Sequence, residues 1–216
     1  MIEEKIKQLR EKLIVMAVLT ESMIERSIKA LQEKNEELIR QVITIDEPKI
    51  NEMEVEVDEL CARIIALFQP EAKDLRTVLT VMKINNDLER IGDMAVNICE
   101  SAEFLIARPP VKKLIIIPKM QAETAGMLKD SISAFMNDDF DLSRNVIARD
   151  DIVDDYKEQV IRELITYMLS DAQTIERSIH LIKVATNLER IADLSTNICE
   201  DTIFMVEGKI IKHQND

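Results

Sequence analysis

The feature that most constrains the fold is a stretch of 24 residues that occurs twice, 100 positions apart. Residues 83–106 read KINNDLERIGDMAVNICESAEFLI, residues 183–206 read KVATNLERIADLSTNICEDTIFMV, and eleven of the 24 positions are identical. A repeat of this length is too long for a solenoid unit and indicates a duplicated small domain. The chain has 216 residues, which is enough for two such domains with cores of their own.

The repeated stretch has two unlike faces when it is built as a helix. Oxygen-bearing side chains fall within a stripe about 80° wide, at Glu89, Asp93, Asn97 and Glu100. Apolar side chains line the nearly opposite side, at Ile84, Leu88, Ile91, Ala95, Ile98 and Leu105. The second copy keeps the polar stripe, at Glu189, Asp193, Asn197 and Glu200. We therefore expect one face to pack and the other to present oxygen ligands to solvent.

Three helices are predicted in each half of the chain. Glycine and proline are scarce and straight-chain residues dominate, which favours long helices over strands. The patterns predict helices over about residues 3–33, 36–68, 72–107, 118–136, 140–169 and 172–206. The strongest boundary is Arg108-Pro109-Pro110. It predicts an N-terminal three-helix bundle in residues 1–108, a linker in residues 109–117 and a C-terminal three-helix bundle in residues 118–216.

Pro48 lies inside the predicted helix 36–68. A proline removes one backbone hydrogen bond, so it should bend or interrupt this helix near Ile45. One bent helix is the interpretation adopted, and the alternative is two helices that meet at residues 46–48. Because short connections make sequential helices antiparallel, the sequence predicts an all-α fold of two tandem three-helix bundles related by duplication.

Acidic ladders are predicted on the middle helix of each half as well. Like charges four residues apart on a helix repel, and a cation shared with the stripe of the next helix would reverse the sign of that cost. The alternative is that an acidic protein simply has acidic, solvated faces, which Arg90 and Arg190 neutralise in part. The candidate metal ligands are Glu47, Asn51, Glu89, Asp93 and Asn97 in the first half, and Asp150, Asp154, Glu189, Asp193 and Asn197 in the second.

Composition excludes several classes of partner. The net charge of −13 argues against a nucleic-acid surface and against docking on an anionic membrane. No apolar run approaches the roughly 20 residues that cross a bilayer, and the N-terminus lacks the apolar region of a signal peptide. Three cysteines without a CxxC are typical of reduced thiols, and we expect buried small side chains, with a metal or redox role as the alternative. These patterns together predict a cytoplasmic protein without membrane insertion. The cysteines are Cys61, Cys99 and Cys199.

Catalytic motifs are missing from the sequence. It contains no phosphate-binding GxxxxGK[ST] loop, no GxGxxG and no nucleophile elbow. Di-iron bundles use Glu-x-x-His motifs, whereas the two histidines here, His180 and His213, lie outside both polar stripes. We expect His180 on the helix surface and His213 in a frayed tail. The sequence therefore favours a protein that is not an enzyme, with a carboxylate-metal hydrolase or oxygen-activating enzyme as the weaker alternative.

These residues resemble the signature of the PhoU family. The resemblance rests on residues 88–93 (LERIGD) and 188–193 (LERIAD), each of which NICE follows after three residues, and on residues 69–70, 117–118 and 148–151. It spans essentially the whole chain. It implies two tandem three-helix bundles with multinuclear metal clusters, of iron or zinc, on the bundle surfaces.

The resemblance also implies which residues bind metal. Its E/D-x-x-x-D motifs correspond to Glu89 with Asp93 and to Glu189 with Asp193, faced by Glu47 with Asn51 and by Asp150 with Asp154. Two departures stand out. Met94 and Leu194 occupy the positions after the motif aspartates where family members commonly have histidine, which leaves an all-oxygen site that would also suit Mg, Mn or Ca. Asn51 is a neutral amide, so the first site should bind cations more weakly than the second.

The function that the resemblance implies is regulatory. PhoU-like proteins are negative regulators of the phosphate-starvation response, thought to couple the phosphate ABC transporter, through its ATPase subunit, to a membrane sensor kinase. The leading hypothesis is therefore a metal-binding adaptor of phosphate uptake and signalling. The alternative is a metal-free helical scaffold whose acidic stripes bind basic partner surfaces. Leftover apolar positions on the first and fourth helices suit a homodimer interface and a core equally well.

Overall fold

A computed structural model describes residues 2–208, which are helical almost throughout and contain no strand. Six helices are long: α1 (Ile2–Glu33), α3 (Glu47–Phe68), α4 (Ala72–Ile106), α5 (Ile116–Asn137), α7 (Asp150–Ser170) and α8 (Ile175–Glu207). Four shorter elements connect them: α2 (Glu36–Gln41), the π-helical turn η1 (Val42–Asp46), α6 (Phe140–Ile147) and the 3-10 turn η2 (Ala172–Thr174).

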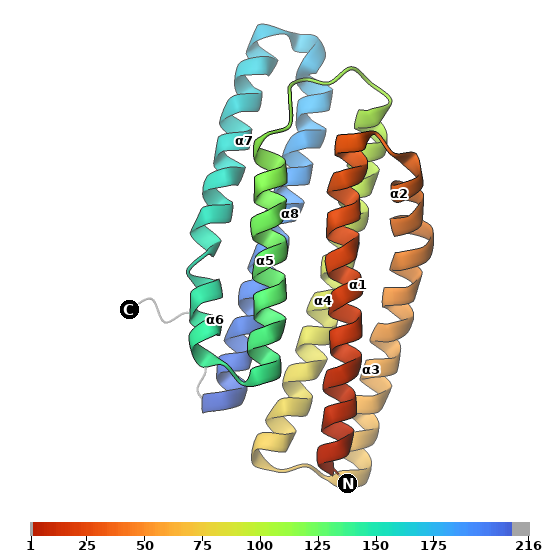
Figure 1. The fold of residues 1–216 in the computed structure, drawn as a ribbon, viewed down its shortest axis with the longest axis vertical. Helices are drawn as coiled ribbons and strands as arrows, with labels where there is room; N and C mark the ends of the chain where they lie inside the picture. The colour runs from red at the N-terminus through yellow and green to blue at the C-terminus, as the bar shows by residue number, and fades with distance from the viewer. Residues whose placement is uncertain (1, 209–216) are drawn as a thin grey trace.

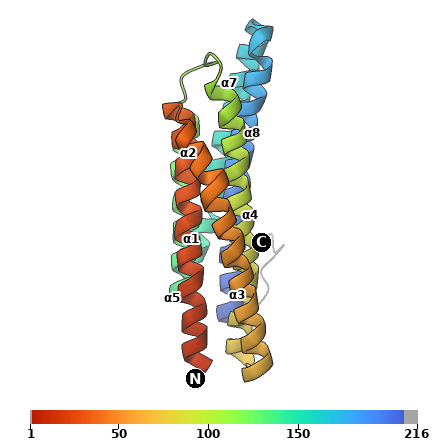
Figure 2. The ribbon, with the colours of Figure 1, turned by 90° about the vertical axis from the view of Figure 1, so that its right-hand side faces the viewer.

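The helices form an elongated molecule with two layers (Figures 1 and 2). The central pair, α4 and α8, runs antiparallel, with α3 packed beside α4 and α7 beside α8. A second layer is formed by α1, which packs on α4, and α5, which packs on α8, and these two helices also contact each other. The two repeats therefore lie side by side along their length and share one continuous core.

The duplication predicted from residues 83–106 and 183–206 extends to the first helix of each repeat. Buried side chains of α1 recur in α5 at a spacing of 104 residues: Met16 and Met120, Thr20 and Thr124, Met23 and Met127, Ser27 and Ser131, and Ala30 and Ala134. Because the same register buries polar and apolar residues alike, the two repeats have the same internal packing. The prediction of a tandem helical repeat is confirmed.

The predicted helix 36–68 stays helical through Pro48. Residues 42–46 form a π-helical turn, and the backbone N–H of Glu47 donates to the carbonyl of Val42, five residues back. Pro48 follows at the start of α3, where its missing N–H leaves fewer backbone partners unsatisfied than it would in a regular helix. The structure therefore agrees with one helix, deformed ahead of the proline, rather than two that meet there.

The prediction of one helix over residues 140–169 is wrong. The chain leaves the helix at Ala148 and Arg149, which separate α6 from α7. The backbone of Arg149 adopts φ −87° and ψ −9°, and its guanidinium reaches across to two carboxylates of α5, Glu123 and Asp130, both at 2.6 Å. This tertiary ion pair, rather than a local proline or glycine, marks the break.

Two predicted boundaries also differ from the structure. α5 begins at Ile116, so the last two residues of the predicted linker 109–117 are helical, and both Ile116 and Ile117 are buried in the core. α8 begins at Ile175 instead of residue 172, because the Asp171 side chain accepts from the N–H of Gln173 and starts a 3-10 turn first.

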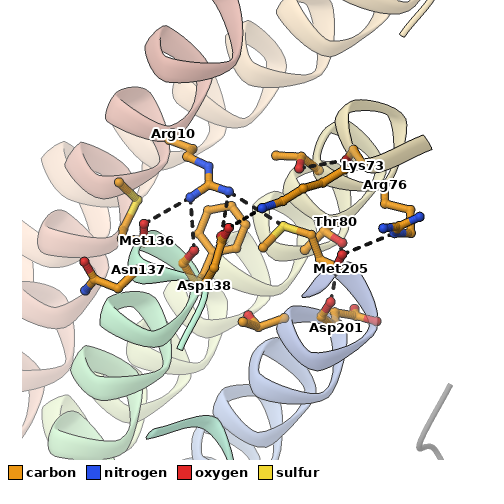
Figure 3. A network of polar contacts seen from close by, with 12 residues as sticks. Arg10, Lys73, Arg76, Thr80, Met136, Asn137, Asp138, Asp201 and Met205 are labelled. Carbon is orange, nitrogen blue, oxygen red and sulfur yellow. Dashed lines mark hydrogen bonds and ion pairs between the residues drawn. The ribbon is translucent and has the colours of Figure 1, made fainter. Parts of the chain in front are cut away.

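A polar joint fastens one end of α1 to the end of α5 (Figure 3). The guanidinium of Arg10 donates to the carbonyls of Phe135 (3.3 Å) and Met136 (3.0 Å) and to Asp138 Oδ1 (2.9 Å). Lys73, at the start of α4, donates to the second oxygen of Asp138 at 2.8 Å. The first repeat thus supplies cations to the carbonyl-rich C-terminus of a helix in the second repeat.

Candidate metal-binding faces

The first acidic face lies where α3 packs beside α4 and comprises Glu47, Asn51, Glu54, Glu89 and Asp93. Asp93 is exposed, and the other four side chains are partly buried. Asn51 donates from Nδ2 to Glu47 Oε1 at 2.8 Å, so the two predicted ligands on α3 already contact each other.

Electrostatics show that the acids of the first face are neighbours across the two helices. The pKa of Glu89 is raised by burial and then by Asp93 and Glu54. Burial and Glu47 raise the pKa of Asp93, whereas burial followed by Asp58 and Asp93 raises that of Glu54. Because each carboxylate resists the ionisation of the others, a cation bound here would lower the free energy of the whole group.

Asn85 fixes α3 against α4 at this face. This fully buried residue donates from Nδ2 to the carbonyl of Glu54 (2.9 Å) and to Asp58 Oδ1 (3.0 Å). Its own Oδ1, like that of Asn51, is buried and accepts no hydrogen bond from residues 2–208. The duplication could not predict this role, because Asn85 differs from its repeat equivalent, Ala185.

The second acidic face lies where α7 packs beside α8 and comprises Asp150, Asp154, Lys157, Glu189 and Asp193. Burial, followed by Asp193, Asp154 and Glu189 in that order of effect, raises the pKa of Asp150 to about 6. Lys157 donates from Nζ to Glu189 Oε1 at 2.8 Å. This face therefore contains a cation of its own.

The two predicted asparagine ligands at the ends of the polar stripes are placed differently from the acids. Asn97 is exposed on α4. Asn197 lines a polar hollow between α8 and α4, together with Lys83, Arg90 and Asp201. On α8 the rotation of about 80° between residues 189 and 197 turns the asparagine towards α4 and away from α7.

The side chains of the described residues do not form a ready-made metal site. No group of three or more His, Cys, Asp or Glu side chains within residues 2–208 converges as ligands of one metal ion. At the first face the chemistry of the donors nevertheless fits a hard cation, because all are oxygens and the amide oxygen of Asn51 accepts no hydrogen bond from residues 2–208. At the second face the fit is poor, since the ammonium of Lys157 already contacts one of the ligands.

His180 lies outside the acidic faces, as its position in the sequence predicts. It is partly buried: its ring stacks on Phe104 at 3.9 Å between ring centroids, and its Nδ1 is buried without a hydrogen-bond partner in residues 2–208. His213 lies outside the described residues. Burial raises the pKa of each cysteine thiol to about 12, as expected for buried, unreactive side chains. The free thiols are Cys61, Cys99 and Cys199.

Two residues of the acidic faces were missed as candidate ligands or counter-ions, although the sequence carries a signal for both. Glu54 follows Asn51 by three residues, and Lys157 follows Asp154 by three residues. On a helix this spacing returns a side chain to the same face. Glu54 belongs to the predicted acidic ladder of its helix although it was not chosen as a ligand, and extending the second ladder by one step would have included Lys157.

No helix of residues 2–208 has an apolar stretch long enough to cross a membrane. The family model described as "PhoU domain" matches residues 13–102 and 117–202. The similarity therefore covers both repeats and both acidic faces.

Among curated proteins, the "Phosphate-specific transport system accessory protein PhoU homolog" of Aquifex aeolicus is 42% identical over 144 residues, which are 67% of this chain and 65% of that protein. The protein of the same name from Caulobacter vibrioides is 40% identical over 144 residues, 66% of this chain and 63% of that one. The chain thus matches slightly less than two thirds of the length of these relatives.

Solved structures extend the likeness along the chain. The crystal structure of PhoU from Pseudomonas aeruginosa superimposes with a TM-score of 0.92 at 33% identity, and the alignment covers 97% of this chain and 100% of that one. PhoU from Streptococcus pneumoniae, described as a phosphate transport system regulatory protein, gives a TM-score of 0.89 at 24% identity over 98% and 99% of the chains. The second comparison concerns the fold alone.

Proposed function

Because this chain belongs to the PhoU family, we propose that it is an accessory, regulatory protein of phosphate transport. The proposal is supported by its relatives from Aquifex and Caulobacter, which are named as accessory proteins of phosphate-specific transport systems. More specifically, we propose that the protein is a cytoplasmic negative regulator that contacts the ATPase subunit of the phosphate transporter and a membrane sensor kinase. In this proposal it catalyses no reaction.

The observation that carries the physical part of the proposal is the first acidic face. Four carboxylates from two helices, Glu47, Glu54, Glu89 and Asp93, lie close enough to resist one another's ionisation. We expect a divalent or trivalent cation to bind there, either iron or zinc, as the resemblance implies, or Mg, Mn or Ca, which all-oxygen ligands favour. Binding requires the side chains of these carboxylates to rotate towards a common point.

The architecture suits an adaptor. The outer helices α3 and α7 bury few side chains and present most of their length to solvent. Long, rigid helices that share one core give wide surfaces whose shape changes little on binding. A bound metal would alter the charge of such a surface, and hence its affinity for a charged partner.

A second candidate function is a metal-free scaffold whose acidic faces bind basic partner surfaces directly. The observation in its favour is Lys157, which shows that a protein ammonium can sit among these carboxylates. The two functions differ in their dependence on metal. In the scaffold, chelator leaves partner binding unchanged, whereas in the metal-dependent adaptor it weakens partner binding.

The proposal is tested by metal analysis of protein purified without chelator. Asp93→Ala removes one carboxylate of the first acidic face, and Glu52→Ala, an exposed acid elsewhere on α3, is the matched control. We expect wild type and Glu52→Ala to retain metal and Asp93→Ala to lose most of it. Equal metal content in all three proteins would reject the site.

The regulatory part has a separate test. The tagged protein is purified from phosphate-replete cells with and without chelator, and co-purifying proteins are identified by mass spectrometry. We expect the transporter ATPase subunit or the sensor kinase among them. If neither is enriched over a tagged unrelated helical protein, the adaptor role is rejected.

A further inference from the structure

The two acidic faces are built on the same frame but differ in charge at two positions. On the middle helices the repeats align at a spacing of 103 residues, so Glu47 corresponds to Asp150 and Asn51 to Asp154. On α4 and α8 the spacing is 100 residues, which pairs Asp93 with Asp193. The remaining difference is the position one turn further along the middle helix. There the first repeat has Glu54 and the second has Lys157.

Lys157 is held at the second face by a short contact. Its Nζ lies 2.8 Å from Glu189 Oε1, and the two side chains are 28% and 17% exposed. The hydrogen bond to Glu189 and the nearby Asp154 and Asp193 raise the pKa of the lysine, so the ammonium keeps its charge. It therefore stands among three of the carboxylates that correspond to the proposed ligands of the first face.

The first face has the opposite composition at this position. The carboxyl group of Glu54 adds to the repulsion between Glu89 and Asp93 instead of relieving it. Among the five residues that define this face there is no ammonium or guanidinium group. Each face thus contains four carboxylates. Arg90 opposes the rise in the pKa of Glu89 at the first face, and Arg190 acts on Asp193 in the same way at the second, so Lys157 is the added cation that distinguishes the second face.

We propose that the Lys157 ammonium takes the place of a metal ion at the second face, so that this protein binds metal through its first repeat only. The inference rests on the proposed metal-binding function and narrows it to one of the two duplicated sites. A metal ion among Asp150, Asp154, Glu189 and Asp193 would lie close to a fixed positive charge that repels it, and it would have to displace that charge from Glu189. Sequence alone favours the second face, because Asp154 is charged where Asn51 is neutral, and the inference reverses that expectation.

Exchange of the two distinguishing residues tests the inference. The metal-free full chain is titrated with Mn²⁺, and the bound ion is counted from the electron paramagnetic resonance signal of the free ion. Lys157→Glu replaces the ammonium of the second face with the carboxylate that the first face has at this position, and we expect the number of tightly bound Mn²⁺ ions to double. Glu54→Lys places an ammonium at the corresponding position of the first face, and we expect at least tenfold weaker binding there.

Single-site controls assign the ions to a face. In the wild type, Asp93→Ala should abolish tight binding and Asp193→Ala should leave it unchanged. In the Lys157→Glu background, Asp193→Ala should remove only the added ions. Lys157→Gln, which removes the charge and keeps a similar side-chain length, provides the same reading if the glutamate variant does not fold by circular dichroism. We expect it to add Mn²⁺ binding that is weaker than that of Lys157→Glu.

The outcomes separate this inference from the function on which it rests. If Asp193→Ala removes half of the bound Mn²⁺ from the wild type and the Lys157 variants bind no more than the wild type, the inference is overturned while metal binding stands. If the wild type binds no Mn²⁺ but Lys157→Glu does, the role of Lys157 is supported and metal binding at the first face is rejected. If no variant binds Mn²⁺, both are overturned.

Discussion

Arg26 on α1 and Asp46 in the π-helical turn form an ion pair that recurs in the second repeat with its charges exchanged. Arg26 Nη1 lies 2.5 Å from Asp46 Oδ2. In the second repeat the arginine is Arg149, between α6 and α7, and its Nη1 lies 2.6 Å from Asp130 Oδ2 of α5. Arg26 corresponds to Asp130 and Asp46 to Arg149 in the register of the repeats. Both pairs sit where the middle helix departs from regular α-helix.

This ion pair predicts a stability effect far from the acidic faces. Arg26→Ala leaves the carboxylate of Asp46, which is 6% exposed, without its cation. We expect the variant to lose about 2 kcal/mol of unfolding free energy and about 4–8 °C in Tm, measured by urea and thermal unfolding. Arg40→Ala, which removes an arginine that is 65% exposed, is the control and should cost less than about 0.5 kcal/mol.

The double variant Arg26→Asp/Asp46→Arg reproduces the arrangement of the second repeat. We expect it to recover at least half of the loss seen in Arg26→Ala, because the pair is restored with its charges exchanged. A double variant no more stable than the single one would show that the pairing does not determine stability here.

The joint between α1 and α5 predicts a stability effect that depends on pH. Burial would raise the pKa of Asp138, but hydrogen bonds from Lys73 and Arg10 outweigh it and leave the pKa below its usual value. The folded pKa is therefore lower than the unfolded value of about 3.9, so the stabilisation is present above pH 4 and is lost as the pH falls through the folded pKa. We expect Arg10→Ala to lower Tm by about 4–8 °C at pH 7.

At pH 3 the difference between Arg10→Ala and wild type should shrink, because Asp138 begins to protonate in both. Lys7→Ala, at a position 78% exposed on the same helix, is the control and should not change Tm at either pH. The prediction fails if the Tm difference between Arg10→Ala and wild type is the same at both pH values.

Metal binding predicts a third effect on stability. A ligand that binds only the folded state at 100 times its Kd adds about 2.7 kcal/mol, which corresponds to a rise of about 5–10 °C in Tm for a chain of this size. We expect Mn²⁺ to raise the Tm of wild type by this amount and excess chelator to reverse it. Asp93→Ala should show no rise. A similar rise in both proteins would place the ion elsewhere.

The sequence predicted the architecture because the hydrophobic period and the duplication are encoded locally. Residues 83–106 carry both a packed face and a polar face, and the structure places Ile84 and Ile98 in the core and Asp93 at the surface. A periodic pattern over that many residues leaves one arrangement that buries the apolar stripe. The prediction that Glu47 on α3 faces Asp93 on α4 followed from this arrangement, since short connections force adjacent helices to pack.

The details that the sequence did not predict depend on contacts between distant residues. The break at Ala148 and Arg149 has no proline or glycine to mark it, and it coincides with ion pairs from Arg149 to Glu123 and Asp130 on α5. The stacking of His180 on Phe104 joins two residues that are 76 positions apart in sequence and lie on different helices. Such contacts appear only after the helices are placed in three dimensions. Lys157 differs, because its spacing of three residues from Asp154 was enough to predict it on the same face of its own helix.

His180 predicts a pH dependence that the acidic faces do not cause. Burial, followed by Lys183, lowers the pKa of His180, whereas Glu176 raises it. Arg108, which stacks on Phe104, lowers the pKa of His180 further. The unfolded chain therefore binds a proton below about pH 6.5 that the folded protein resists, so this residue makes stability fall as the pH drops below that value. His180→Phe keeps a ring against Phe104 and removes the titration.

We therefore expect the unfolding free energy of wild type to fall more between pH 7.5 and pH 5.5 than that of His180→Phe, measured by guanidinium unfolding. The comparison of the two proteins cancels the carboxylates that titrate in both. His180→Ala should lose about 1 kcal/mol at either pH, because the stacked ring is gone. Parallel decreases in wild type and His180→Phe would mean that the imidazole of His180 accepts a proton in the folded state as readily as in the unfolded chain.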